Sequence, residues 1–199
     1  MSISAKITAF FISQGIVPDE DREVYEYGFE LLLADLFNFS VILLISAITG
    51  LVWPTMIYIC IFVGLRSVCG GYHAKTHLRC HICTIGAYFL FIVLLNMQAI
   101  TDKATVLLIG DFFAAIPVIL FAPIPHTNKP LSPKAYNRNR LLSIILFTSL
   151  FLMAIFLRQL ERPEGIIISL ALWIVSLCMI PAIKLYPFTK RRKNHEKNR

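Results

Sequence analysis

Six apolar runs, separated by short polar segments, dominate the chain. Runs of this kind predict membrane-spanning helices, although each is shorter than the ~20 residues of a simple span. We therefore predict an all-α polytopic integral membrane protein with about six transmembrane helices. Four spans, with a re-entrant segment in place of one hairpin, fit the pattern almost as well. The runs cover residues 36–51, 55–65, 81–96, 105–120, 141–157 and 166–180.

Residues 1–35 are amphipathic and acidic rather than continuously apolar. Ile3, Ile7 and Phe10 recur at helical spacing, which suggests a helix that lies in the membrane interface. Pro18 then precedes three acidic residues, a typical start of a second helix. We expect this N-terminal part to be retained and to lead directly into the first span.

The composition agrees with a membrane protein: 57% of the residues are hydrophobic, 16% are charged, and the mean hydropathy is +0.69. The net charge of +7 raises the question of nucleic acid, but seven of the nineteen Lys and Arg residues lie in the tail 184–199. A basic tail beside an apolar segment is typical of a surface that faces anionic lipid. We therefore expect the lipid bilayer, and no nucleic acid, as a partner.

The distribution of Lys and Arg predicts the orientation in the membrane. With a cytosolic N-terminus and six spans, 16 of the 19 basic residues fall on cytosolic segments, and only Lys103, Arg158 and Arg162 fall outside. Basic residues gather on the cytosolic side of membrane proteins. We expect both termini in the cytosol, with the segment 66–80 and the basic tail 184–199 on the same side.

The stretch 66–83 concentrates the reactive side chains, with three cysteines, three histidines and a Gly-Gly pair. A cysteine becomes a nucleophile where cations favour its thiolate and a histidine can take its proton. Cys80 follows an arginine and has His73 upstream, and Cys83 is the next candidate. We predict that 66–80 is a catalytic segment on the cytosolic face.

The spacing between His73 and Cys80 constrains this interpretation. In one straight helix they would share a face but stand roughly 10 Å apart along the axis, too far for a hydrogen bond of about 3 Å. We expect the chain to bend between them, or the pair to form across a homodimer. Gly70 and Gly71 would supply flexibility and a backbone that a substrate can approach closely.

A metal site is the alternative interpretation of the same residues. The cysteines and histidines of 69–83 are spaced as zinc ligands can be, which would suit a small membrane metal transporter or sensor. The segment from His73 to His77 lacks the glutamate of the metalloprotease motif. The remaining cysteines, Cys60 and Cys178, are expected to be small buried apolar residues.

Taken together, these residues resemble the accessory gene regulator B (AgrB) family of bacterial membrane endopeptidases, which process quorum-sensing propeptides. The resemblance covers nearly the whole chain. It rests on Arg66, Gly70-Gly71, His73-Ala74 and Cys80 in order and spacing, on the upstream segment 27–30, and on Ala122-Pro123 and the segment 128–130.

The resemblance implies a cysteine endopeptidase in which Cys80 is the nucleophile and His73 the base, with no cofactor. Arg66 and Gly71 match positions that imply substrate binding, and Glu30 is a candidate to orient His73. The implied substrate is a short amphipathic propeptide (AgrD-like), whose acidic C-terminal tail is removed while the signal segment closes into a thiolactone or lactone. The implied location is the bacterial cytoplasmic membrane, with residues 1–199 as one membrane-embedded peptidase domain.

Overall fold

The computed structural model describes residues 2–70, 77–124 and 132–185. Within these ranges the chain forms helices and no strand, so the predicted all-α class is confirmed. Each of the six predicted apolar runs lies on one of the six long helices. The elements are α1 (Ile3–Ser13), the 3₁₀ turn η1 (Asp19–Asp21), α2 (Arg22–Thr49), α3 (Val52–Cys69), α4 (His77–Leu95), α5 (Gln98–Thr101), α6 (Ala104–Phe121), α7 (Pro133–Gln159) and α8 (Glu164–Leu185).

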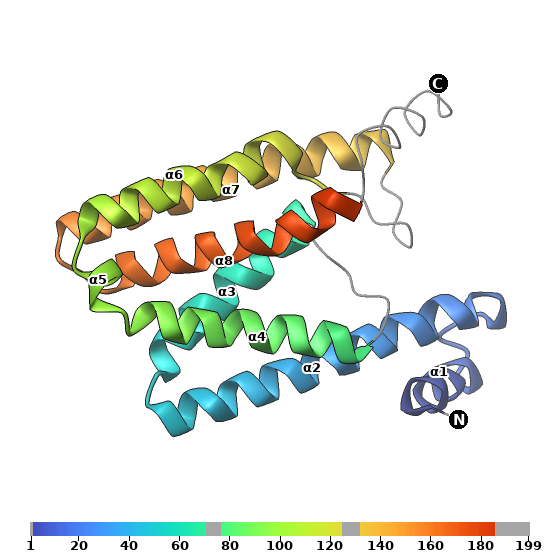
Figure 1. Cartoon of the computed structure of the whole chain (residues 1–199). Helices are drawn as coiled ribbons and strands as arrows, with labels where there is room; N and C mark the ends of the chain where they lie inside the picture. Colours follow the sequence, from blue (N-terminus) through green and yellow to red (C-terminus); the bar gives the residue numbers. More distant parts are fainter. Residues whose placement is uncertain (1, 71–76, 125–131, 186–199) are drawn as a thin grey trace.

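The six long helices lie side by side and alternate in direction along the chain (Figure 1). The N-terminal ends of α2, α4 and α7 and the C-terminal ends of α3, α6 and α8 share one end of the bundle, where α1 also lies. The short helix α5 lies at the opposite end. The segments predicted to face the cytosol therefore leave the described helices at one common end.

Five helices are long and apolar enough to cross a membrane: α2 together with η1, α3, α6, α7 and α8. The apolar part of α4, Cys80–Leu95, is shorter. The whole of α4 has 19 residues, which at the standard rise is about 28 Å, close to the ~30 Å of the hydrocarbon core. The protein is a multi-pass membrane protein, and six spans with cytosolic termini stay a prediction.

Local sequence signals explain several helix ends. Gly50, at φ 72°, caps the C-terminus of α2 in the left-handed conformation that favours glycine. At the start of α7, the Ser132 side chain accepts a hydrogen bond from the Ala135 amide, and Pro133 occupies the first turn, where its missing N–H costs nothing. From the sequence alone, the four prolines at positions 123, 125, 130 and 133 predict a loop without regular helix. This prediction was wrong for Pro133, which begins α7.

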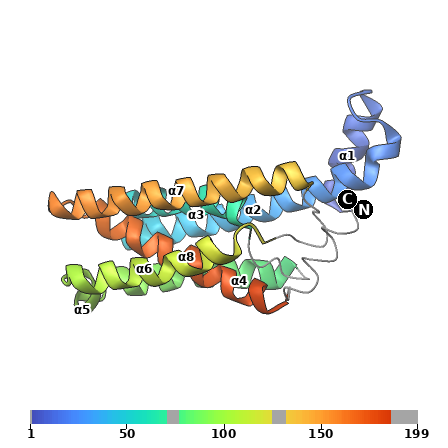
Figure 2. The same ribbon diagram turned by 90° about the horizontal axis from the view of Figure 1, so that it is seen from above.

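α8 is the central helix of the bundle. It packs against α3, α4, α6 and α7, and Figure 2 shows its N-terminal half between α7 and α6. The long helices around it turn large apolar side chains outward, such as Ile48, Phe113 and Leu141, as lipid-facing surfaces require. Buried polar positions are mostly small: Ser4, Thr8, Asn38, Ser46, Thr55, Asp111, Ser143, Ser169 and Ser176.

A buried polar cluster joins α6, α7 and α8. The carboxylate of Asp111, which is fully buried, accepts hydrogen bonds from Arg158 at 2.8 Å and from Trp173 Nε1 at 2.9 Å. Ser169 Oγ donates to Asp111 at 3.0 Å and accepts a hydrogen bond from Arg158. Gly110 permits this arrangement, because a Cβ at that position would stand 2.0 Å from the Trp173 ring.

The sequence analysis counted Arg158 on the side of the membrane away from the cytosol, and this stays a prediction. Arg158 lies in the last turn of α7 and its side chain is only 11% exposed. The guanidinium turns inward because the buried carboxylate of Asp111 offsets the cost of removing it from water.

Removing one member of this buried pair is expected to destabilise the bundle strongly. In Asp111→Asn the Arg158 charge loses its counter-charge, and we expect a loss of about 3–5 kcal/mol in the free energy of unfolding, measured by denaturation in detergent micelles. The double variant Asp111→Asn/Arg158→Met should recover much of this loss. Arg162→Met, which removes an exposed pair with Glu164, is the matched control and should cost less than about 1 kcal/mol. Equal effects of D111N and R162M would contradict the assigned role.

Candidate functional site

Cys80 lies in the first turn of α4, at the end of the bundle where the predicted cytosolic segments emerge. It is half-buried, so a reagent or substrate can reach it. Cys69, by contrast, is completely buried beside Ser143 of α7, and Cys83 is exposed one turn further along α4. Of the thiols in the motif, Cys80 and Cys83 are therefore accessible and Cys69 is not.

Two segments that are far apart in the sequence meet at this end of the bundle. The amide of Ile124, just after α6, donates a hydrogen bond of 3.0 Å to the carbonyl of Cys69, and Gly70 pairs with Ile124 in an isolated bridge. Gly70 has φ 70°, and a Cβ there would stand 2.5 Å from the Ile124 carbonyl oxygen. Glycine is therefore required at position 70. We expected a substrate to approach the backbone of the Gly-Gly pair closely. At Gly70 the backbone of Ile124 makes this close approach instead.

Arg66 is in the last turn of α3, and its guanidinium lies 5.5 Å from the centre of the Phe62 ring. It borders a cavity of about 250 Å³ between α3, α4 and α8, here called the α3–α4–α8 cavity. Cys178 lies against Arg66 on the α8 side. The cavity is lined by Arg66, Cys83, Gly86, Ala87, Leu90, Ile174, Leu177, Cys178 and Pro181.

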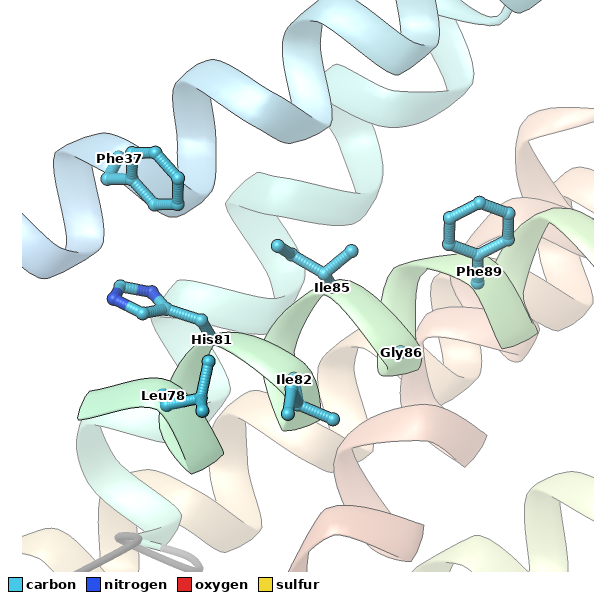
Figure 3. Close-up of a pocket in the computed structure, with 7 residues that line it drawn as sticks. All are labelled: Phe37, Leu78, His81, Ile82, Ile85, Gly86 and Phe89. Carbon is cyan, nitrogen blue, oxygen red and sulfur yellow. The ribbon is translucent and has the colours of Figure 1, made fainter. Parts of the chain in front are cut away.

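A second hollow, the α2–α4 groove, lies on another face of α4 (Figure 3). It has a volume of about 730 Å³ and is lined by Phe37, Leu78, His81, Ile82, Ile85, Gly86 and Phe89. At one end the His81 ring meets the edge of Phe37, with ring centres 5.1 Å apart. This groove is apolar apart from the imidazole.

His81 is held by Asn38, a residue that the sequence analysis did not single out. Its Nδ1 lies 2.7 Å from Asn38 Oδ1, an oxygen that can accept a hydrogen bond from a protonated Nδ1. Asn38 is only 1% exposed, and its Nδ2 has no partner among the described residues. The bond connects α2 to α4 one residue after Cys80.

Asp35 was also missed by the sequence analysis, which began the first span at residue 36. It lies one turn before Asn38 on α2, within electrostatic range of both Arg66 and His81. A carboxylate and an amide three residues apart lie on the same helix face. This spacing of two polar residues inside an apolar region was the sequence signal that could have identified them. Asp35, Asn38, Arg66 and His81 thus form a group of polar side chains that joins α2, α3 and α4.

Two of the predicted site residues, His73 and Gly71, lie outside the described residues, as does any bend between His73 and Cys80. Glu30 is half-buried on α2, and its predicted relation to His73 stays a prediction. The alternative of a metal site also stays a prediction. The described ranges hold no group of three or more possible metal ligands, but His73 and the side chain of His77 lie beyond these ranges.

The expectation for the remaining cysteines was wrong in part. Cys60 is exposed on α3 rather than buried. Cys178 is half-buried and borders the α3–α4–α8 cavity instead of filling a core position.

The fold and this site define a class: a polytopic α-helical membrane protein with an accessible thiol and a cluster of polar side chains at one end of its bundle. Comparison with known proteins gives the family. The family model "Accessory gene regulator B" matches residues 4–181, and the chain belongs to that family.

The curated relatives carry the same or related names. Protein FsrB of Enterococcus faecalis is 26% identical over 159 residues, which are 80% of this chain and 64% of that protein. Accessory gene regulator protein B of Staphylococcus intermedius is 28% identical over 127 residues, 64% of this chain and 66% of that protein. The chain thus matches just under two thirds of these two relatives. A putative AgrB-like protein of Listeria welshimeri is 25% identical, with 89% of this chain and 87% of that protein covered. No solved structure matches.

The Asn38 contact predicts a specific tautomer of His81. In protein labelled with ¹⁵N-histidine, the His81 signals should show the proton on Nδ1. Asn38→Leu should abolish this preference and lower the free energy of unfolding by about 1 kcal/mol, because one hydrogen bond between helices is lost. Asn96→Leu is the matched control, since the Asn96 side chain donates to the Ile92 carbonyl of the adjoining helix α4 and does not join two helices within the described residues. An unchanged His81 tautomer in N38L would show that Asn38 does not hold the ring.

Proposed function

We propose that this protein is a cysteine endopeptidase that removes the C-terminal tail of a quorum-sensing propeptide and promotes its cyclisation. The observation that carries the proposal is the placement of Cys80. It is an accessible thiol in the first turn of α4, three residues before Cys83, which lines a cavity that Arg66 also borders. Membership of the accessory gene regulator B family supports a role in the processing of such peptides.

In the first step Cys80 Sγ attacks the carbonyl carbon of the scissile peptide bond. His73 takes the thiol proton and passes it to the leaving amine of the tail, so the C–N bond breaks and a thioester joins the signal segment to Cys80. Conversion of an amide into a thioester is uphill. Removal of the released tail or export of the product then draws the reaction forward.

In the second step a Cys or Ser side chain of the bound peptide attacks the thioester carbon. Its proton goes to His73 and then to the departing Cys80 sulfur, which restores the thiol and closes the peptide into a thiolactone or lactone. When the attacker is Cys, one thioester replaces another, so this step is nearly balanced in energy. Water must be kept from the thioester meanwhile, and a half-buried thiol at the membrane surface suits this need.

Arg66 is the candidate for binding a substrate oxygen, and Gly71 for approaching the peptide backbone. The guanidinium presents several donors in a fixed plane and can hold a carboxylate or a developing oxyanion. Asp35 lies within electrostatic range of Arg66, so its carboxylate can offset the charge of Arg66 when no substrate is bound.

The site is proposed to face the cytosol. At the same end of the bundle Lys134, Arg138 and Arg140 are exposed on the first turns of α7, where they can attract the acidic tail of a propeptide. A homodimer is the arrangement to consider if His73 and Cys80 of one copy do not meet.

The thioester intermediate can be detected directly. Purified protein in lipid is incubated with a short amphipathic propeptide of the AgrD-like kind, and mass spectrometry should find an adduct at Cys80 that matches the propeptide without its tail. Cys80→Ala should give no adduct because the nucleophile is missing, and His73→Ala none because the thiol keeps its proton. Cys60→Ala, at an exposed cysteine of α3 that does not line the cavity, is the matched control and should retain the adduct. Tail release by C80A would contradict the assignment.

We expect the planar guanidinium of Arg66 to contribute to tail release beyond the effect of its positive charge. Arg66→Lys keeps one positive charge but loses paired hydrogen bonds, so kcat/KM for tail release should fall by about tenfold or more. Lys134→Arg, a like change at an exposed site, should leave it within about twofold. Full activity of R66K would count against substrate binding through two parallel hydrogen bonds.

A further inference from the structure

The α3–α4–α8 cavity lies next to the proposed nucleophile. Cys83, on its wall, follows Cys80 by three residues, which is about 4.5 Å along the helix axis. Ala87, also on the wall, is seven residues after Cys80 and therefore lies on nearly the same face of α4. A group attached to Cys80 through one bond to sulfur can thus extend along α4 into this cavity.

The walls are mainly apolar, with polar groups at defined points. Ala87, Leu90, Ile174 and Leu177 supply aliphatic surface. Arg66 supplies N–H donors. Pro181 lies inside α8 and has no N–H, so it cannot make the usual helical hydrogen bond to the carbonyl of Leu177.

A buried hydroxyl close to the cavity also lacks a partner. Tyr58 is 1% exposed, and its hydroxyl has no hydrogen-bond partner among the residues that the structure describes. It lies within electrostatic range of Cys178 and Arg66, which both border the cavity. Buried hydroxyls are nearly always paired, so an unpaired one here is consistent with a site completed by a ligand.

We propose that the α3–α4–α8 cavity is the specificity pocket for the propeptide, taking the apolar side chain of the residue whose carbonyl Cys80 attacks. Arg66 then donates to the backbone of that residue. This inference rests on the proposed function, because it needs an acyl group on Cys80. The volume of the α3–α4–α8 cavity, about 250 Å³, lies below the range of pockets for whole small ligands and suits one side chain.

The α2–α4 groove is a poorer candidate for this role. Its α4 residues, such as Leu78, Ile82 and Ile85, lie on the far side of the helix from Ala87 and the face of Cys80. It is also about three times larger than the cavity, at about 730 Å³ against about 250 Å³.

The pocket is tested with chloromethyl ketones, in which a thiolate displaces chloride and forms a thioether. N-acetyl derivatives of Gly, Ala, Leu and Phe chloromethyl ketone differ only in the side chain that the pocket would receive. The full-length protein in lipid vesicles is treated with each reagent, and peptide mapping by mass spectrometry gives the rate at Cys80 separately from the other cysteines. Each rate is divided by the rate with iodoacetamide, which carries no side chain.

We expect the Leu reagent to react at Cys80 at least about tenfold faster than the Gly reagent. One additional methylene group bound in an apolar pocket typically changes the rate by about tenfold or more. Leu177 borders the cavity and is 47% exposed, so it can be replaced without disturbing the core. Leu177→Trp should reduce the Leu to Gly ratio to within about twofold by filling the pocket, and Leu177→Ala should shift the preference toward Phe. Leu152→Trp, at an exposed position on α7, is the control and should keep the original ratio.

Two results would overturn the pocket: a Leu to Gly ratio near one in the unaltered protein, or the original ratio in both Leu177 variants. In either case Cys80 can still react with iodoacetamide in a manner that depends on His73, and the peptidase proposal survives. If Cys80 resists every reagent, or if His73→Ala leaves its iodoacetamide rate unchanged, the proposed function fails and the pocket with it.

Discussion

Lipid on every side removes most of the hydrophobic drive for helix association, so this bundle must be held by close packing and by polar contacts at buried positions. The cluster around Asp111 meets both needs. Gly110 lets the ring of Trp173 come within contact of α6, and the ring nitrogen bonds the neighbouring carboxylate. With α6 and α7 attached to it in this way, α8 can serve as the centre against which α3 and α4 also pack. The candidate site around Cys80, at the other end of the bundle, depends on this packing of helices around α8.

The helices were predictable because each span must satisfy its backbone internally and present apolar side chains to lipid. Apolar runs therefore located all six long helices. The ends were less predictable: Pro133 was assigned to a loop although it begins α7, because proline fits a first helical turn as well as a turn between helices. The contact of Arg158 with Asp111 was not predicted, because the charge rule counts residues along the chain and does not describe packing between helices.

The site was predictable only as far as its residues are neighbours in sequence. Cys80 and Arg66 belong to one short stretch, and both lie at the expected end of the bundle. Asp35 and Asn38 come from a different helix, and no local pattern connects them to His81. The contact of Gly70 with Ile124 joins segments more than fifty residues apart. Such pairings are set by tertiary packing, which hydropathy does not encode.

The pairing of Asp111 with Arg158 also bears on the order of assembly during synthesis. α6 leaves the ribosome before α7 and α8, so a carboxylate enters the membrane before any of its partners exists. An isolated charge in hydrocarbon is costly. α6 therefore gains stability in the bilayer when α7 and α8 bring Arg158, Ser169 and Trp173 to this carboxylate.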